Sequence, residues 1–146
     1  MPHLTLQISA NGPIVELFVG VSAPRAEALK KANRPVPSPI MIRGLIDTGA
    51  SCTSLDPSVL SALGIVSTGT TPIHTPSTKL GVPHVAKQYD ISVVLPHPMI
   101  NRTFSAIPVI ESELAQLGIH ALIGRDILAV CLLTYDGTAQ TFTLGF

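Results

Sequence analysis

The apolar residues of this chain fall into many short runs, and this pattern limits the folds it can form more than any other feature. Between residues 3 and 9, Leu4, Leu6 and Ile8 alternate with polar residues, which is the period of a strand with one buried face. Similar runs recur along the 146 residues, separated by Gly, Pro, Asn and Asp. The sequence therefore predicts an all-β protein, a small closed or sandwich-like barrel.

Turn residues group the predicted strands into hairpins. Asn11-Gly12 suits a tight turn between two paired strands in the segment up to residue 21. A long hairpin with a polar tip is expected over residues 70 to 88, and another over residues 129 to 146, turning at Asp136-Gly137. Short apolar runs at 40 to 46 and 119 to 124 supply buried strands between them.

Two segments depart from the strand pattern. Residues 56 to 64 predict a short helix, because Asp56 can cap free N–H groups, Pro57 fits a first turn and Gly64 can end it. Residues 22 to 39 hold four prolines and most of the local charge. They predict an exposed loop inserted within the sheet, which allows a helical turn around Glu27 to Lys31.

Composition narrows the classes of partner. Hydrophobic residues make up 46% of the chain and charged residues only 12%, so we expect a partner, most simply a second copy, to cover part of the surface. The formal charge is zero and no run of like charges occurs. Neither nucleic acid nor an anionic membrane surface is therefore an expected partner.

The length of the chain predicts one domain over residues 1 to 146. The N-terminus and the cysteines favour a cytoplasmic protein. The N-terminus lacks a basic region followed by an apolar stretch, and no apolar window approaches the length of a membrane span. Without an export signal, Cys52 and Cys131 are expected to be free thiols. The five histidines are scattered and no Cys-x-x-Cys pattern occurs, so no metal site is expected.

The chemical signal lies in LIDTGAS, residues 45 to 51. Asp47 directly follows a buried apolar run, and the predicted helix follows the motif. An Asp-Thr-Gly triplet alone is weak, because roughly one chain in thirty of this length contains one by chance. A second motif, ALIGRDIL, follows at residues 121 to 128. Two linked motifs make the signal more specific than the triplet alone.

Together these motifs resemble the retropepsin-like aspartic proteases, the retroviral proteases and their cellular and bacterial relatives. The matching segments occur in the order of that family: LIDTGAS at 45 to 51, QYDISVVL at 88 to 95, LIGRDIL at 122 to 128 and the closing TLGF. The resemblance covers the chain from about residue 13. It implies a small β-barrel with a flap, hydrolysis of peptide bonds, and no metal or organic cofactor.

The implied reaction needs two carboxyl groups, one acting as general base on a water molecule and the other as general acid. Two carboxyl groups at such a short distance cannot both be ionised, because their negative charges repel each other, so the pair shares a proton. The chain has one Asp-Thr-Gly triplet, and we expect the second carboxyl group to be Asp47 of an identical chain, placed by a two-fold axis. The resemblance therefore implies a symmetric homodimer, with an interface hairpin over residues 129 to 146.

The same resemblance gives neighbouring residues supporting roles. Gly49 leaves room for backbone beside the carboxylates, the Thr48 hydroxyl bonds to the opposite chain, and Ser51 holds the outer carboxylate oxygen. Gly124 is expected where two backbones come close, and Arg125 is expected to be a structural charge. The full expected set is Asp47 for catalysis, with Thr48, Gly49, Ala50, Ser51, Gly124 and Arg125 in support.

The hairpin over residues 70 to 88 would be the flap, closing over an extended peptide that adds as a strand. Substrate contacts are expected from Thr75, Pro76, Ser77, Thr78, Lys79, Ile119, His120 and Leu122. Apolar pockets would favour hydrophobic residues beside the cut bond. Two alternatives stay open, an inactive dimeric module that binds extended peptides and the protease part of a longer polypeptide.

Overall fold

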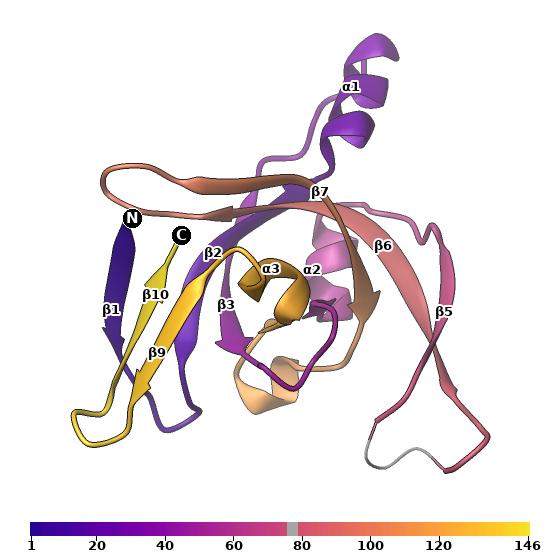
Figure 1. Ribbon diagram of the computed structural model, residues 1–146. Helices are drawn as coiled ribbons and strands as arrows, with labels where there is room; N and C mark the ends of the chain where they lie inside the picture. The colour runs from indigo at the N-terminus through magenta and orange to yellow at the C-terminus, as the bar shows by residue number, and fades with distance from the viewer. Residues whose placement is uncertain (76–78) are drawn as a thin grey trace.

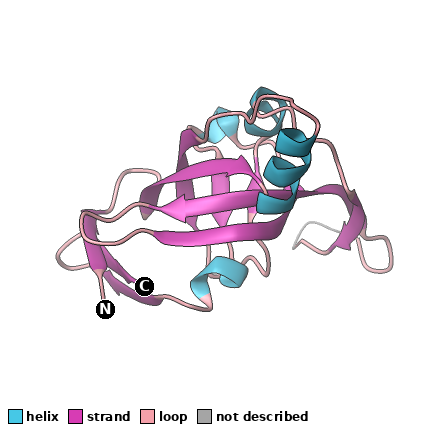
Figure 2. Cartoon of the chain, turned by 90° about the horizontal axis from the view of Figure 1, so that it is seen from above, coloured by secondary structure: helices cyan, strands magenta, loops and turns pink. Residues whose placement is uncertain are grey.

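The structure, a computed structural model, describes residues 1 to 75 and 79 to 146. Its strands form the body of the molecule and its short helices lie around them (Figure 2). In chain order the elements are β1 (His3–Gln7), β2 (Ile14–Val21), α1 (Ala23–Lys31), β3 (Ile40–Ile46), β4 (Ser54–Leu55), α2 (Pro57–Ala62), β5 (Gly69–Ile73), β6 (His84–Leu95), β7 (Arg102–Glu111), the 3-10 turn η1 (Ala115–Leu117), β8 (Ala121–Ile123), α3 (Arg125–Leu128), β9 (Leu132–Asp136) and β10 (Thr141–Gly145). The all-β prediction is confirmed.

Six strands close into a barrel. Their order is β2-β3-β8-β4-β7-β6, and pairing of β2 with β6 completes the ring, while β5 is attached to the outer part of β6. The β3–β8 and β4–β7 pairs are parallel and the others are antiparallel. Because each strand of the ring has a paired neighbour on both sides, these paired stretches expose no sheet edge. The predicted closed barrel is therefore confirmed.

The core fills this barrel with aliphatic side chains from alternating strand positions. On β2, Val15, Leu17 and Val19 are at most 1% exposed, while Glu16 between them faces solvent. Their partners in the core include inward-facing residues of β6, among them Ile91, Val93 and Leu95, which are 0% exposed. Burial of each such side chain contributes about 1.5 to 3 kcal/mol, so the alternation seen in the sequence fixes which face of each strand turns inward.

A second, three-stranded sheet has the order β1-β10-β9, and the two chain ends lie close together where β1 starts and β10 ends (Figure 1). The backbone N–H of Phe146 donates to the carbonyl of Pro2 at 3.0 Å. The hairpin expected between residues 3 and 21 is wrong. The turn at Asn11-Gly12 forms, but beyond it β1 pairs with β10, because β2 already pairs with β3 and β6 in the barrel.

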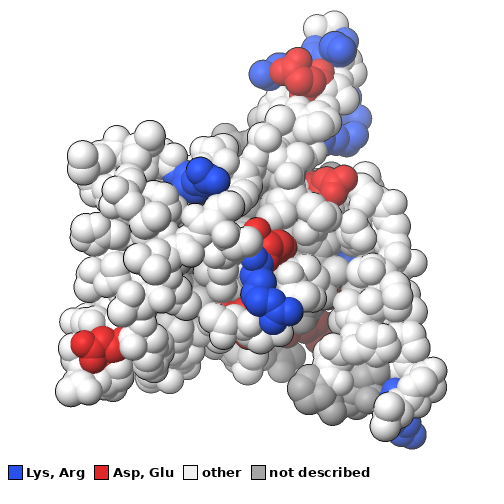
Figure 3. Space-filling model, in the orientation of Figure 1, with Lys and Arg blue, Asp and Glu red and all other residues white. Residues whose placement is uncertain are grey.

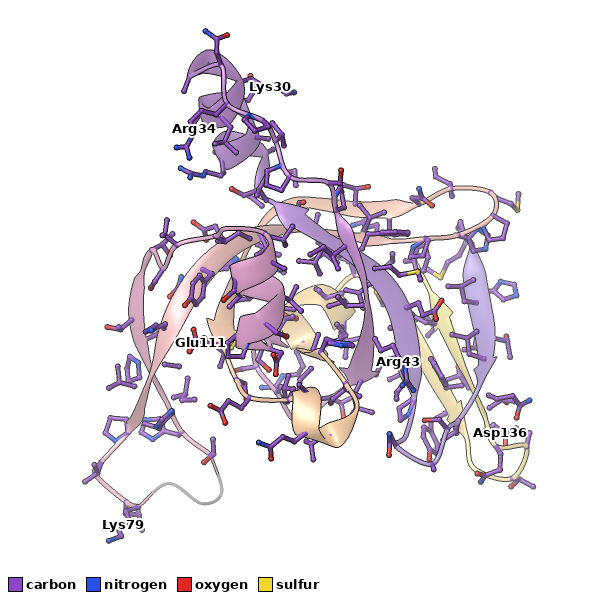
Figure 4. All side chains as sticks on the ribbon, turned by 180° about the vertical axis from the view of Figure 1, so that it is seen from behind. Lys30, Arg34, Arg43, Lys79, Glu111 and Asp136 are labelled. Carbon is purple, nitrogen blue, oxygen red and sulfur yellow. The ribbon has the colours of Figure 1, made fainter. Side chains whose placement is uncertain are left out.

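The segment over residues 22 to 39 is mostly exposed, as predicted, and the helical turn expected around Glu27 to Lys31 is part of a longer, nine-residue helix, α1. The helix starts before the expected turn because the Ser22 side chain accepts a hydrogen bond from the N–H of Arg25 and a proline lies in the first turn. Leu29 is its one buried residue. The helix projects from the barrel, with Lys30 and Arg34 on the projecting part (Figure 4).

Charge is unevenly distributed over the surface. In Figure 3 charged side chains appear as separate spots on a largely uncharged face, and several gather on the projection formed by α1. Most of this face is therefore formed by uncharged residues. Across residues 1–75 and 79–146, no helix has the length and apolar character needed to cross a membrane.

Candidate active site

Asp47 begins a tight loop, residues 47 to 53, that we call the Asp47 loop. The backbone N–H of Asp47 donates to the carbonyl of Ile123 at 3.0 Å, and its carboxylate Oδ1 accepts from the N–H of Gly49 at 2.9 Å. The N–H of Ala50 then donates to the Asp47 carbonyl at 3.2 Å. These contacts hold the half-buried Asp47 side chain at the end of β3.

The barrel topology explains why the two sequence motifs meet. Strands β3 and β8 are parallel, with Ile46 opposite Ile123, so both strands end at the same edge. The Asp47 loop therefore leaves the sheet beside the turn at Gly124 that starts α3. Parallel neighbours bring the residues after their ends together, which the separate motifs in the sequence could not show.

Arg125 holds the Asp47 loop by donating hydrogen bonds to backbone carbonyls of the loop. Its N–H donates to the carbonyl of Ala50 at 2.9 Å. Its guanidinium Nη1 donates to the carbonyls of Thr48 at 3.0 Å and Gly49 at 3.3 Å. A cation that satisfies carbonyls of a tight turn restricts the shape of that turn, so Arg125 contributes to the geometry around Asp47.

Gly124 lies where the two segments touch. A Cβ atom at this position would lie 2.5 Å from the carbonyl carbon of Cys52 and 2.6 Å from its oxygen. Both are backbone atoms, so a side chain would force the segments apart. The close approach of two backbones expected at Gly124 is present in the structure.

Two residues that the sequence reasoning did not select complete the contact. Thr53 is 1% exposed, and its Oγ1 donates to Oδ1 of Asp126 at 2.8 Å while its N–H donates to Oδ2 at 2.8 Å. The available signal was an acid in the first turn of α3, where a carboxylate is stabilised by free N–H groups. Sequence reasoning treated Asp126 only as part of a motif.

Cys52, within the Asp47 loop, is a poor candidate for a nucleophile. Burial raises the pKa of its thiol, the negative charge of Asp126 raises it further, and a hydrogen bond with the Ser51 side chain lowers it by less. Burial likewise raises the pKa of Cys131, against a lowering effect of Arg102. Both cysteines are free. In the described residues, 1–75 and 79–146, no three His, Cys, Asp or Glu side chains gather as a metal site.

Asp56, just beyond the loop, is a structural carboxylate. Burial alone would raise its pKa, but hydrogen bonds from the Ser58 hydroxyl and from the N–H groups of Leu114, Ser58 and Ala115 outweigh burial and lower the pKa well below its usual range. Asp56 is 5% exposed and caps α2, as the sequence predicted. It ties α2 to the segment before η1 and stays ionised at neutral pH.

The predicted substrate-contact residues fall into four groups. His120 and Leu122 are half-buried near β8, and Thr75 and Lys79 are exposed on the β5–β6 hairpin, where Lys79 lies at the end far from the barrel (Figure 4). Ile119 is 2% exposed, so its side chain packs inside the chain, and its contact with substrate stays a prediction. Pro76, Ser77 and Thr78 lie outside the described residues.

A cavity elsewhere in the molecule contains none of these residues. It has a volume of about 390 Å³ and opens between β1 and β2. Its lining is Leu4, Leu6, Gln7, Ser9, Ile14, Val15, Glu16, Arg43 and Pro96. The Asp47 loop therefore lies outside this cavity, on another part of the barrel surface.

Comparisons with known proteins agree with this geometry at the level of fold. No family model and no curated protein sequence matches the chain. Among solved structures, the chain resembles a retropepsin-like aspartic protease from Rickettsia conorii, with 20% identity, a TM-score of 0.59 and coverage of 99% of this chain and 90% of that chain. It also matches the retroviral protease-like domain of Ddi1 from Leishmania major, with 12% identity, a TM-score of 0.38 and coverage of 86% and 82%.

The match to the rickettsial protein extends over almost the whole chain and includes both the barrel and the segments that hold Asp47. Its level of identity supports a statement about fold, and the fold agrees with the strand order described above. This chain therefore has the retropepsin-like fold.

Proposed function

We propose that the chain is an aspartic endopeptidase that acts as a homodimer, with the Asp47 side chains of two chains forming the catalytic pair. The observation that carries this proposal is the position of Asp47. Its carboxylate stands on a tight loop that the second motif holds through Arg125 and Gly124, on a retropepsin-like barrel. A carboxylate held in this way is suited to pair with its symmetry copy.

In the proposed reaction one Asp47 carboxylate takes a proton from a water molecule, and the protonated Asp47 of the partner donates to the carbonyl of the cut bond. The proton belongs to the pair and changes sides during the reaction. Thr48 is exposed on the loop, where its hydroxyl is available to a second chain. Ser51 is also exposed, and its contact with the carboxylate remains a prediction.

The terminal sheet supports the proposed dimer. β1 and β9 are its outer strands, and an unpaired strand edge is available to another chain. Val130, Leu132 and Tyr135, on and beside β9, are 45%, 58% and 58% exposed. Apolar side chains along an open edge are suited to an isologous interface, so we assign this sheet, with the 129–146 hairpin, to dimerisation.

The β5–β6 hairpin supports the proposed binding of an extended peptide. It projects past the barrel (Figure 1) and carries three exposed apolar side chains, Leu80, Val82 and Val85. As a flap, it would pair with the backbone of the peptide and leave alternate side chains to pockets. Exposed apolar residues on the hairpin favour substrates with hydrophobic residues around the cut bond.

The test compares Asp47→Asn with Asp90→Asn in cleavage of fluorescently labelled casein. Asparagine keeps an oxygen that can accept from the Gly49 N–H but cannot act as a base, so cleavage by Asp47→Asn should fall to background. Asp90 is exposed on β6, and Asp90→Asn should cut at the wild-type rate. Sedimentation should show the same dimer for all three proteins.

The same preparation tests the dimer by dilution. Because each active site needs two chains, specific activity should fall once the protein concentration drops below the dissociation constant. Cleavage that persists in Asp47→Asn would exclude the proposed chemistry. A wild-type dimer that binds peptides without cutting them would favour the alternative of an inactive peptide-binding module.

A further inference from the structure

We propose that Asp126 and Thr53 form a clamp that positions the Asp47 loop, which makes both of them positioning residues for the hydrolysis. This inference rests on the proposed function, because it assigns a role in that reaction. We name the pair the Thr53–Asp126 clamp. Neither residue belongs to the Asp-Thr-Gly triplet, and neither needs to touch the substrate to act.

Both oxygens of the Asp126 carboxylate accept hydrogen bonds. Oδ1 accepts from the Thr53 hydroxyl and from the N–H of Ile127, both at 2.8 Å, and Oδ2 accepts from the N–H of Thr53 at 2.8 Å. The Thr53 hydroxyl also accepts from the N–H of Gly124 at 3.1 Å. A carboxylate accepts on both oxygens, whereas an amide presents N–H groups on one side. Asparagine at this position would therefore face a donor with another donor.

The position of Thr53 explains why the clamp matters for Asp47. The first residue of the loop is held by the bond from the Asp47 N–H to Ile123, and the last is Thr53, held by Asp126. Both anchors belong to the continuous segment from β8 to α3. Between them Arg125 holds the carbonyls of the loop. Release of one end would let the loop shift. The Asp47 carboxylate would then move relative to Asp47 of the second chain in the proposed dimer.

Such a shift should affect the chemical step more than substrate binding. A catalytic group displaced by about 1 Å costs on the order of 100-fold in rate. Peptide binding would depend mainly on the flap and the pockets, and within residues 1–75 and 79–146 the hydrogen bonds of the two clamp side chains go to Gly124, Ile127 and each other's residue rather than to these parts. A clamp that positions the carboxylate therefore predicts a lower kcat with little change in KM.

The chain offers a matched control for the loss of a hydroxyl. Ser58 Oγ donates to Asp56 Oδ1 at 2.6 Å, the same chemical pair as Thr53 and Asp126, but at the start of α2. Ser58→Ala removes a comparable hydrogen bond away from the Asp47 loop. If hydroxyl-to-carboxylate bonds only stabilise the fold, the two sites should respond alike.

The kinetic experiment uses the full chain and a fluorogenic peptide chosen from the wild-type cleavage profile. Thr53→Val keeps the shape of the side chain and removes its hydroxyl, and its kcat should fall about ten-fold or more with KM within about two-fold. Thr53→Ser restores the hydroxyl and should recover most of kcat. Ser58→Ala should leave kcat unchanged at temperatures where it is folded.

A second measurement follows the clamp without any need for activity. Asp126→Asn removes a negative charge that raises the pKa of Cys52, so the alkylation rate of Cys52 by iodoacetamide should rise at lower pH than in the wild type. Thr53→Val keeps that charge and should not show this effect. Mass spectrometry separates the Cys52 peptide from the Cys131 peptide. Hydrogen exchange at the Gly124 amide should accelerate in Thr53→Val and not in Ser58→Ala.

These outcomes separate failure of the inference from failure of the proposed function. If the wild type cuts peptides and Thr53→Val retains its kcat, the clamp does not position the catalytic group. If the wild type does not cut at all, the proposed function fails, and the exchange measurement at Gly124 then decides whether the clamp holds the loop. Unchanged Gly124 exchange in Thr53→Val would overturn the clamp in either case.

Discussion

Strand β3 has a connection at each end, and the two connections are built in opposite ways. At its start, residues 22 to 39 form a projection with α1, of which Leu29 is the one buried helical residue. At its end, the Asp47 loop is held by backbone and side-chain bonds to the segment from β8 to α3. In Figure 1 the two lie at opposite ends of the same strand.

The difference between the two connections indicates at which positions the structure should tolerate substitutions. Four of the nine Lys and Arg residues, Arg25, Lys30, Lys31 and Arg34, are concentrated in the projection, where solvent screens their charges. The Asp47 loop has few charges, and each charged group there has defined partners. Hydrogen bonds therefore fix the geometry of the Asp47 loop, which carries the proposed catalytic group. Substitutions should be tolerated less well there than in the projection.

The largest expected difference comes from adding one methyl group. Gly124→Ala places a Cβ against the backbone of Cys52, and neither segment can move without breaking the bonds of the Asp47 loop. We expect a loss of about 3 kcal/mol or more in the free energy of unfolding. The measurement is urea unfolding followed by circular dichroism.

Gly69→Ala is the matched control, because nothing lies within 4 Å of a Cβ at Gly69. It should change the free energy of unfolding by about 0.5 kcal/mol or less. Equal losses for the two substitutions would show that the Asp47 loop can relax, and the contrast between the ends of β3 would then lose its physical basis.

Local patterns were enough to predict an all-β protein, a closed or sandwich-like barrel, whereas the closed barrel with a flap and the role of the Asp47 loop were implied by the family resemblance. Alternation of apolar residues marked the strands, and a triplet after a buried run marked the loop. The pairing of β1 was not predictable in the same way, since the turn at Asn11-Gly12 is a correct local signal that says nothing about β10. Competition among strands for partners decides such pairings.

The clamp shows the same limit within the candidate site. Thr53 and Asp126 are far apart in the chain, and each is an ordinary residue for its own segment. The pairing of both β3 and β4 with β8 brings them together. By contrast, Asp56 was predictable as a helix cap from its neighbours, although its bonds to Leu114 and Ala115 were not. Local chemistry can be predicted from sequence more readily than contacts between distant segments.

The second prediction uses acid to compare Asp56, which lies just beyond the Asp47 loop, with the projection at the start of β3. The folded-state pKa of Asp56 lies below its unfolded value of about 3.9, for the hydrogen-bonding reasons given above. Its stabilising contribution is therefore complete above that unfolded value and is lost as the pH falls through the folded-state pKa. Asp56→Asn should lower the free energy of unfolding by about 2 kcal/mol at pH 7 and flatten its dependence on pH below 4.

The matching variant on the projection is Glu27→Gln. Glu27 is exposed and its carboxylate contacts Lys30 at 3.6 Å, so its removal should leave the acid limb of the stability curve unchanged. Free energies of unfolding measured from pH 2 to pH 7 provide the comparison. An acid limb that flattens equally in both variants would contradict the assignment of this dependence to Asp56.

The smallest effects are expected on α1 itself, and they test what holds the projection in place. Leu29→Ala removes the one buried side chain of the helix. It should cost between about 1 and 2 kcal/mol, below the usual range for a core leucine, because the helix can shift over the barrel surface. Lys30→Ala removes an exposed ion pair and should cost about 0.5 kcal/mol or less. Hydrogen exchange should show the loss from Leu29→Ala confined to residues 23 to 34, with the amides of the Asp47 loop unchanged. If exchange in the Asp47 loop also accelerates, the two ends of β3 are coupled, and the projection contributes to the geometry of the candidate site.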